Sequence, residues 1–205
     1  MSSTGPALAM FEISDIPRGL RALDALVKHA PVDIVATGTV QSGRYLVGFR
    51  GQVEAVLRSY DRAREVADGF VFDSVLLPHA EARIVPAFRA GTVRWPAPGD
   101  TLGVVQTASC PTLLGAVDAA LKGAHVDLVE MRLADGLGGR AIATFWGGIE
   151  DVQAAIEIAQ GAITRHREPC APSPDEATYA VIPNADDEVR RAVSGGTRFF
   201  KEWRG

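Results

Sequence analysis

An internal repeat constrains the fold of this chain more than any other feature of its sequence. Residues 24–35 read DALVKHAPVDIV and residues 118–129 read DAALKGAHVDLV. Asp, Ala, Lys, Ala, Val, Asp and Val therefore all return 94 positions later. A repeat of this length indicates that one folding unit has been duplicated.

The repeat extends on both sides of these stretches. Residues 7–13 match residues 101–107 at the same offset, and residues 45–56 match residues 141–152 at an offset of 96. The two additional residues must lie between the matched stretches, and an insertion tolerated there indicates a loop. The facing segments are Gln41, Ser42 and Gly43 in the first copy and Asp135, Gly136, Leu137, Gly138 and Gly139 in the second.

Length and composition are those of a soluble protein with two similar domains. The 205 residues are long enough for each copy to bury its own core. The net charge is −4 and no run of Lys and Arg suggests a nucleic-acid partner. Residues 1–6 do not resemble a signal peptide, and no stretch approaches the roughly 18 apolar residues of a membrane helix. The sequence predicts a cytosolic protein without nucleic-acid or membrane partners.

Strands and helices are expected to alternate in the same order in both copies. The first copy has expected strands at 8–13, 32–40, 44–50 and 70–77, with helices at about 15–30, 51–68 and 79–88. The second copy has expected strands at 102–107, 126–133, 140–146 and 179–182, with helices at about 111–124, 150–165 and 186–193. This order predicts an α/β fold in which each domain is one sheet with helices packed on it.

The domain boundaries follow from the repeat and from the positions of proline and glycine. We expect a first domain at residues 7–90, a linker at 91–100, a second domain at 101–183 and a C-terminal extension at 184–205. The linker contains Gly91, Pro96, Pro98 and Gly99. The extension ends in an aromatic tail at residues 199–203, which is expected to pack on its own domain, with a neighbouring subunit as the alternative partner.

The glycine loop at residues 135–139 allows three interpretations. It is not a G-x-G-x-x-G, and it precedes a strand where a dinucleotide fingerprint would open a helix, so phosphate binding is disfavoured. A tight hairpin whose backbone needs positive φ is the structural interpretation. The third is that small residues allow several copies of the loop to crowd around a symmetry axis.

No residue pattern indicates catalysis or metal binding. Cys110 precedes Pro111 at an expected helix start, where the dipole could lower the thiol pKa, but an ordinary buried thiol is favoured. Cys170 lies in a proline-rich loop. The four histidines have no second ligand at metal spacing and are expected to cap helix ends or face solvent: His29, His79, His125 and His166. The acidic residues are scattered, and no motif pairs two carboxylates.

Lys28 and Lys122 are the most informative charged residues. Each lies near the end of the first helix of its copy, four residues after Asp24 or Asp118. A helical ion pair with the Lys at the favourable C-terminal end explains this spacing without any function. The same pair in two copies that otherwise differ at their surface instead suggests a contact that both copies make with neighbouring molecules.

The order of these motifs resembles the bacterial microcompartment shell domain. The shared pattern is a strand, a helix ending D-A-x-x-K-x-A, a V-D-[IL]-V strand, a glycine-containing turn, a strand ending in Gly, and a helix beginning [VI]-E. Two copies in one chain are similar to the tandem-domain shell proteins, three of which form a pseudohexagonal tile. The resemblance covers about residues 7–90 and 101–180 and implies ferredoxin-like domains.

The resemblance assigns roles to particular residues. It places Gln41, Ser42, Gly43, Asp135, Gly136, Leu137, Gly138 and Gly139 around a central pore. It places Lys28 and Lys122, with Asp24, Asp118 and His79, at the edges between tiles. The family's Arg between two prolines is absent from both copies, at residues 77–79 and 172–174. The first-copy turn also lacks the cysteine with which some members hold an iron–sulfur cluster, so no cofactor is expected.

The function implied by the resemblance is that of a homotrimeric tile with a pore for small metabolites. The expected location is the microcompartment shell in the bacterial cytoplasm, and the expected partners are hexameric and pentameric shell proteins and the encapsulated enzymes. The alternative is a regulatory or binding trimer that holds a small-molecule ligand at its glycine loops. An enzyme built from two similar domains is a third interpretation.

Overall fold

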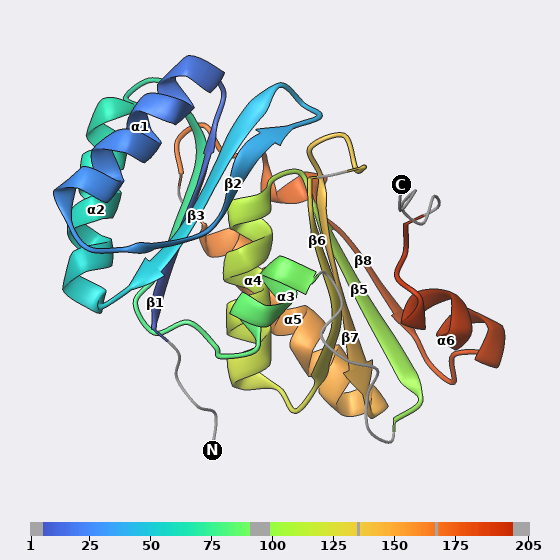
Figure 1. Ribbon diagram of the computed structural model, residues 1–205. Coiled ribbons are helices and arrows are strands. Elements are labelled where there is room, and N and C mark those ends of the chain that lie inside the picture. Colours follow the sequence, from blue (N-terminus) through green and yellow to red (C-terminus); the bar gives the residue numbers. More distant parts are fainter. Residues whose placement is uncertain (1–5, 91–98, 135, 167, 199–205) are drawn as a thin grey trace.

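Two four-stranded antiparallel sheets form the framework of the protein in the computed structural model, which describes residues 6–90, 99–134, 136–166 and 168–198 (Figure 1). The strand order is β2-β3-β1-β4 in the first sheet and β6-β7-β5-β8 in the second. The two orders are the same once the elements are matched by the repeat. The predicted α/β fold is therefore confirmed, with one sheet and its helices for each copy.

The helices and strands follow the expected sequence of elements. The first copy consists of β1 (Ala7–Ile13), α1 (Ile16–His29), β2 (Asp33–Val40), β3 (Arg44–Gly51), α2 (Val53–Val66), β4 (Val71–Leu77) and α3 (Ile84–Ala90). The second consists of β5 (Thr101–Thr107), α4 (Cys110–Gly123), β6 (Asp127–Leu133), β7 (Ala141–Gly147), α5 (Ile149–Arg165), a 3₁₀ turn (Pro174–Glu176), β8 (Thr178–Ile182) and α6 (Asp187–Ser194).

Strand register fixes which residues of the two copies are equivalent. Glu12 of β1 pairs with Asp73 of β4, and Gln106 of β5 pairs with Thr178 of β8. Because Glu12 and Gln106 match at the 94-residue offset, Asp73 and Thr178 occupy the same place in their sheets. These four positions differ in charge between the copies, although the backbone pairing around them is the same.

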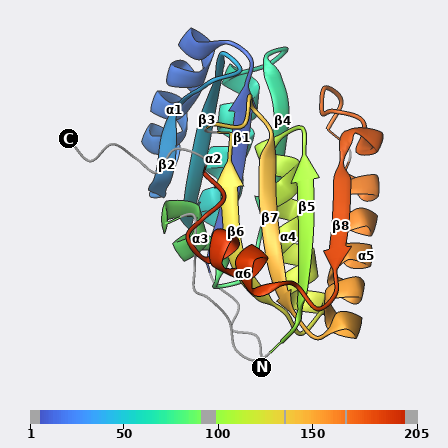
Figure 2. The same ribbon diagram turned by 90° about the vertical axis from the view of Figure 1, so that its right-hand side faces the viewer.

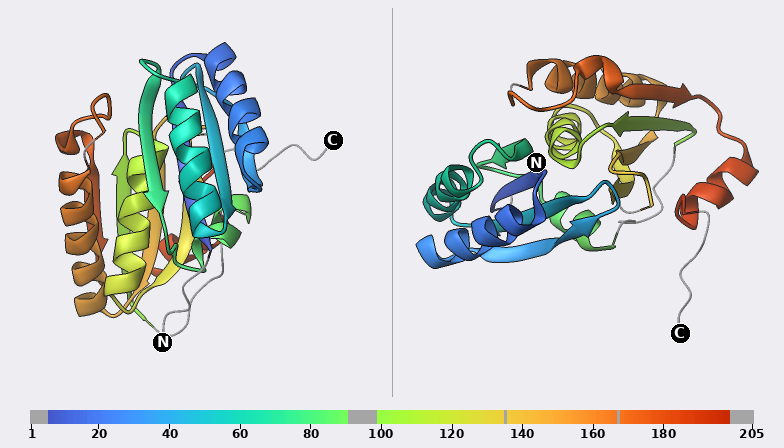
Figure 3. Two further views of the ribbon diagram at one scale, coloured as in Figure 1. Left: turned by 90° about the vertical axis from the view of Figure 1, so that its left-hand side faces the viewer. Right: turned by 90° about the horizontal axis from the view of Figure 1, so that it is seen from above.

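The sheets and helices stack in layers, and each sheet meets different helices on its two faces (Figures 2 and 3). Helices α1 and α2 cover one face of the first sheet, around Phe11 and Phe49. Helices α4 and α5 cover the second sheet, and α4 also packs on β4 and β1 of the first. Leu8 and Met10 therefore belong to the same apolar cluster as Leu114. Helix α6 lies on the far face of the second sheet, against Trp146.

One helix begins later than the sequence predicts. The short helix expected from residue 79 begins at Ile84, and residues 79–83 form a turn after β4. Pro86 lies in the first turn of this helix, where a missing N–H costs no hydrogen bond. Residues 91–98 of the expected linker and residues 199–205, which include the aromatic tail, lie outside the described residues. None of the described helices is long and apolar enough to span a bilayer.

Candidate functional site

Two glycine turns close the hairpins at one end of the molecule. Gly43 ends the β2–β3 turn with φ of +75°, and the longer β6–β7 turn has Gly136, Gly138 and Gly139 at φ of +74°, +60° and +86°. Glycine is favoured at such angles because it has no Cβ to clash with the backbone. The hairpin interpretation of these glycines is therefore confirmed.

The two turns contact each other within one chain (Figure 1). The Gly138 N–H points to Gln41 Oε1 at 3.5 Å. A Cβ placed on Gly139 would lie 2.7 Å from the Ser42 Cβ. Seven of the eight residues predicted to line a pore therefore belong to two adjoining turns, while Asp135 lies outside the described residues. Their role around a pore remains a prediction, because it depends on other copies of the chain.

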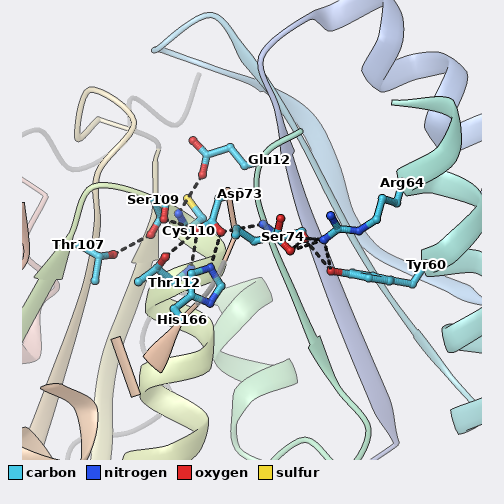
Figure 4. A network of polar contacts seen from close by, with 11 residues as sticks. Glu12, Tyr60, Arg64, Asp73, Ser74, Thr107, Ser109, Cys110, Thr112 and His166 are labelled. Atoms are coloured by element: carbon cyan, nitrogen blue, oxygen red, sulfur yellow. Dashed lines mark hydrogen bonds and ion pairs between the residues drawn. The ribbon is translucent and has the colours of Figure 1, made fainter. Parts of the chain in front are cut away.

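We call the packing of α4 on β1 and β4 of the first sheet the inner seam. At its centre, the start of α4 faces two buried carboxylates of the first sheet (Figure 4). Glu12 and Asp73 are both 0% exposed. The Cys110 N–H donates to Glu12 Oε2 at 3.0 Å, and the Thr112 N–H donates to Asp73 Oδ2 at 3.0 Å. The free N–H groups at the start of a helix carry partial positive charge, so they stabilise both carboxylates.

Asp73 has further partners that complete its hydrogen bonding. The Thr112 hydroxyl donates to it at 2.7 Å, the Ser74 N–H donates at 2.8 Å, and the Ser109 hydroxyl also donates. His166 Nε2 lies 2.5 Å from Asp73 Oδ1. A buried carboxylate with this many donors is well compensated for its loss of water.

Glu12 has fewer hydrogen-bond partners than Asp73. Burial raises the pKa of the Glu12 carboxyl, while hydrogen bonds from Arg44 and from the Cys110 N–H oppose that rise. Arg44 Nη1 lies 2.6 Å from Glu12 Oε1, and its guanidinium stacks 3.4 Å above the Phe72 ring. The guanidinium of Arg44, from the first domain's own sheet, is therefore the cation that pairs with the buried Glu12 carboxylate.

A second polar group ties the segment after α5 to the first domain (Figure 4). Glu168 accepts from the Arg64 guanidinium and from the Ser74 hydroxyl, the latter at 2.9 Å. Arg64 also donates to the Tyr60 hydroxyl at 3.0 Å. Together with His166, these contacts anchor the end of the second domain's long helix on β4 and α2.

Sequence reasoning missed this cluster. The acidic residues looked scattered, but strand register pairs Glu12 with Asp73 across 61 positions. His166 was expected to cap a helix end or face solvent. It is the C-cap residue of α5, and its ring also contacts buried Asp73, whereas His29, His79 and His125 are exposed. Burial raises the Cys110 pKa well above its ordinary value, so the possible lowering by the helix dipole is not realised.

Among the described residues, neither a reactive thiol nor a metal-binding group is found at this cluster. Cys110 is fully buried, as the favoured interpretation expected, and Cys170 is exposed. No three or more His, Cys, Asp or Glu side chains are grouped for metal binding in the part of the chain that the structure describes. The arrangement around Asp73 joins two domains rather than presenting a reactive group to a substrate.

The two Asp–Lys pairs form as expected but lie in different surroundings. Lys28 Nζ is 2.7 Å from Asp24, and the two side chains are 72% and 61% exposed. Lys122 Nζ is 2.6 Å from Asp118, whose side chain is only 9% exposed and accepts the Glu81 N–H at 2.8 Å. The pair in the first copy is therefore in solvent, while the pair in the second is partly built into the inner seam.

The turn after β4 accounts for this difference. Arg83 donates to the carbonyl of Leu121 in the last turn of α4 at 3.1 Å and to the carbonyl of Val126, directly before β6, at 2.7 Å. Its Nε lies 3.0 Å from Glu81. The bond to Leu121 satisfies a carbonyl group that the helix end leaves free. His79 is exposed in the same turn.

Two exposed surfaces correspond to the two buried halves of the inner seam. On α1, Leu20 and Val27 are 51% and 42% exposed, whereas Leu114 and Leu121, which match them on α4, are 0% and 3% exposed. On β8, Thr178, Ala180 and Ile182 form an exposed row. The matching row on β4 is Asp73, Val75 and Leu77, which α4 covers. The chain thus exposes one helix face and one sheet face of a contact that it also makes internally.

Comparisons with known proteins identify the relatives of this chain. A family model for the BMC domain matches residues 7–80 and again residues 101–171. The bacterial microcompartment shell protein PduT of Citrobacter freundii is 29% identical over 153 residues, covering 75% of this chain and 82% of PduT.

Two solved structures extend the comparison. A microcompartment protein from Desulfitobacterium hafniense matches with a TM-score of 0.75 and 29% identity, covering 90% of this chain and 98% of that one. A fused permuted hexameric shell protein from the RMM microcompartment has a TM-score of 0.60 and 19% identity, over 80% of this chain and 86% of its own. The second likeness bears on the fold alone.

Proposed function

This chain belongs to the BMC domain family, and from that premise we propose that three copies of it close into one pseudohexagonal tile with a central pore for small metabolites. It is a structural protein of the bacterial microcompartment shell, in the bacterial cytoplasm, and not an enzyme. As a shell protein it assembles with other shell proteins. The pore, the trimer and the choice of hexameric and pentameric tiles as partners are parts of the proposal.

The observation that carries the trimer is the match between the exposed surfaces and the inner seam. In the inner seam, α4 of the second domain covers β1 and β4 of the first. The same contact between molecules, which we call the outer seam, would place α1 of one copy on β5 and β8 of the next. Leu20 and Val27 would then be buried as Leu114 and Leu121 are buried within the chain. Alternation of inner and outer seams closes a ring of six domains after three chains.

The same ring gives the glycine turns their role. One chain supplies two adjoining turns, so three chains bring six turns to the axis. Small residues at Ser42, Gly43 and Gly138 let these turns approach, and free backbone N–H groups offer polar partners to passing metabolites. Passage would be selective diffusion without chemistry.

Native mass spectrometry of the whole chain tests the trimer. We expect a species of about 65 kDa, three times the chain mass of 21.7 kDa. Leu20→Asp together with Val27→Asp should convert it to monomers, because each buried carboxylate would lose its water without gaining a partner. Leu57→Asp is the matched control, since Leu57 is exposed on α2 and Gln153, which matches it on α5, is also exposed. A wild-type chain that stays monomeric or dimeric would refute the trimer.

Permeation and tiling distinguish the shell function from ligand binding. Ser42→Leu should change metabolite passage through assembled tiles while leaving the trimer intact, and loss of the trimer in this variant would count against its place at the pore. A trimer that never forms sheets and binds one metabolite tightly would favour the regulatory alternative. Sheets with only weak metabolite affinity would favour the tile.

A further inference from the structure

The inner seam and the proposed outer seam differ in the placement of their carboxylates. We propose that this placement makes the two seams non-interchangeable, so that α1 docks on the second domain of another copy and not on a first domain. The partner that this surface selects is a second copy of this chain in a single orientation, with first and second domains alternating around the ring. The proposal rests on the proposed trimer and adds the residues that determine its pairing.

In the inner seam, the carboxylates belong to the sheet and the helix supplies only donors. Ser109, the N-cap of α4, does not cap its own helix with its side chain, and its hydroxyl donates to Asp73 instead. The free N–H groups of Cys110 and Thr112 donate to Glu12 and Asp73. The start of α4 therefore depends on carboxylates from the first domain.

In the outer seam, the carboxylate belongs to the helix, and the strand positions equivalent to Glu12 and Asp73 are neutral. Asp15 matches Ser109 at the 94-residue offset, and its Oδ1 accepts the Arg18 N–H at 2.8 Å, so α1 caps itself. The strands that α1 would meet carry Gln106 and Thr178 where the first sheet carries Glu12 and Asp73. Such a helix start needs no carboxylate from a partner.

If α1 displaced α4 from the first sheet, like charges would come together. Asp15 would take the place of Ser109, beside the buried carboxylates of Asp73 and Glu12. Three carboxylates in a site closed to water repel one another and lose their hydration. Arg18 would take the place of Thr112, whose hydroxyl donates to Asp73 at 2.7 Å. The Arg18 guanidinium lies 4.9 Å over the Phe70 ring, so its charge is placed at that ring and not at the position of the Thr112 hydroxyl.

Two further exchanges act in the same direction. His166 is the C-cap residue of α5, whereas the C-cap residue of α2 is Ala67, whose methyl group cannot replace the imidazole nitrogen that lies beside Asp73. In the reverse error, α4 would meet Thr178 and Gln106, and its N-terminal N–H groups would lose both carboxylates. Each wrong pairing therefore leaves either unpaired charge or unsatisfied donors, which is how interfaces exclude unwanted partners.

The test adds the missing carboxylate to the outer seam of the whole chain. Thr178→Asp should lower the association constant of the trimer at least about tenfold, because the new carboxylate faces Asp15 of the neighbouring copy. Asp15→Ser in the same chain should restore trimers, since Ser is an equally good N-cap and matches the helix of the inner seam. Thr178→Asn, which has the shape of Asp without its charge, is the neutral control and should remain trimeric.

The readout is the trimer fraction by sedimentation velocity across a dilution series, with thermal unfolding to show that each variant is folded. Thr178 is exposed in the single chain, so the substitution should leave the fold of the monomer unchanged. Thr178→Asp trimers of wild-type strength, or a loss that Asp15→Ser does not reverse, would overturn the proposal. A wild-type chain that is not a trimer would instead show that the proposed function is wrong.

Discussion

Asp73 is the side chain on which the inner seam depends most. We expect Asp73→Asn to lower the free energy of unfolding by about 2–3 kcal/mol, because an amide accepts fewer hydrogen bonds and holds no charge for the helix start. Urea unfolding at fixed protein concentration measures the loss. Asp24→Asn is the matched control, since its pair is solvent-exposed and should cost less than about 0.5 kcal/mol. Equal losses in the two variants would contradict the assigned role of Asp73.

Glu12 should make the stability of the protein depend on pH. Burial raises its pKa above the ordinary value of 4.5, so the folded state binds a proton more readily than the unfolded state. The contribution of Glu12 is therefore fully present below that value and is lost as pH rises through the folded pKa. We expect the free energy of unfolding of the wild type, minus that of Glu12→Gln, to fall from pH 4 to pH 7.

Denaturant unfolding of both proteins at several pH values measures this difference, in which most other titrating groups cancel. A difference that rises with pH would mean that Arg44 and the Cys110 N–H outweigh burial. A flat difference would mean that the folded and unfolded pKa values are equal.

Single-residue roles were the least predictable part of the sequence. Glu12 and Asp73 lie in predicted strands, but their pairing depends on the register of β1 against β4, which the sequence does not show. The surroundings of His166 depend on how the second domain sits on the first. Neither the strand register nor the docking of the two domains is visible in local residue spacing, so a single sequence gives no sign of the cluster around Asp73.

Among the elements, the β6–β7 turn is the one whose backbone most requires glycine. Gly139→Ala should destabilise the chain by at least about 1–2 kcal/mol, since φ is +86° and the new Cβ would lie 2.7 Å from the Ser42 Cβ. Thermal unfolding gives the measurement. Gly38→Ala in β2 is the control, because nothing lies within 4 Å of its added Cβ. A Gly139→Ala protein as stable as the control would show that the two turns do not hold each other.

The helices and strands were predictable because the sequence contains two copies of the same order of elements. Periodicity and the matched turns predicted every strand of both sheets to within a few residues. The elements that were harder to match lie near prolines. Pro86 lies inside α3, and the additional residues at 168–176 increase the offset between the two copies beyond 96. This shift hid the correspondence between α3 after β4 and α6 after β8, where Leu77-Pro78 matches Ile182-Pro183.

At the scale of the whole molecule, docking of the domains could not be read from the sequence. The matched halves predict two similar domains, but both α1 and α4 carry apolar residues on the same faces. Only the structure shows that α4 is covered within the chain while Leu20 and Val27 remain exposed. The unequal charges at Asp15 and Ser109 are visible in the sequence, but they have no meaning until the strands that face them are known.

Lys28 and Lys122 are proposed to lie at the edges where tiles meet in the shell. Lys28→Ala should change the free energy of unfolding by less than about 0.5 kcal/mol, because its pair with Asp24 is exposed. Lys122→Ala should cost about 1 kcal/mol, since Asp118 is largely buried and keeps only the Glu81 N–H. The chains of both variants should still form trimers.

Electron microscopy of the double variant tests the edge itself. A lysine stem at a tile edge packs on the neighbouring tile while its ammonium reaches a carbonyl across the boundary. Loss of both stems should therefore leave trimers that no longer form sheets, whereas Arg62→Ala, which removes an exposed cation from α2, should leave sheets unchanged. Normal sheets from Lys28→Ala with Lys122→Ala would refute the edge assignment, and they would leave the trimer and both of its seams in place.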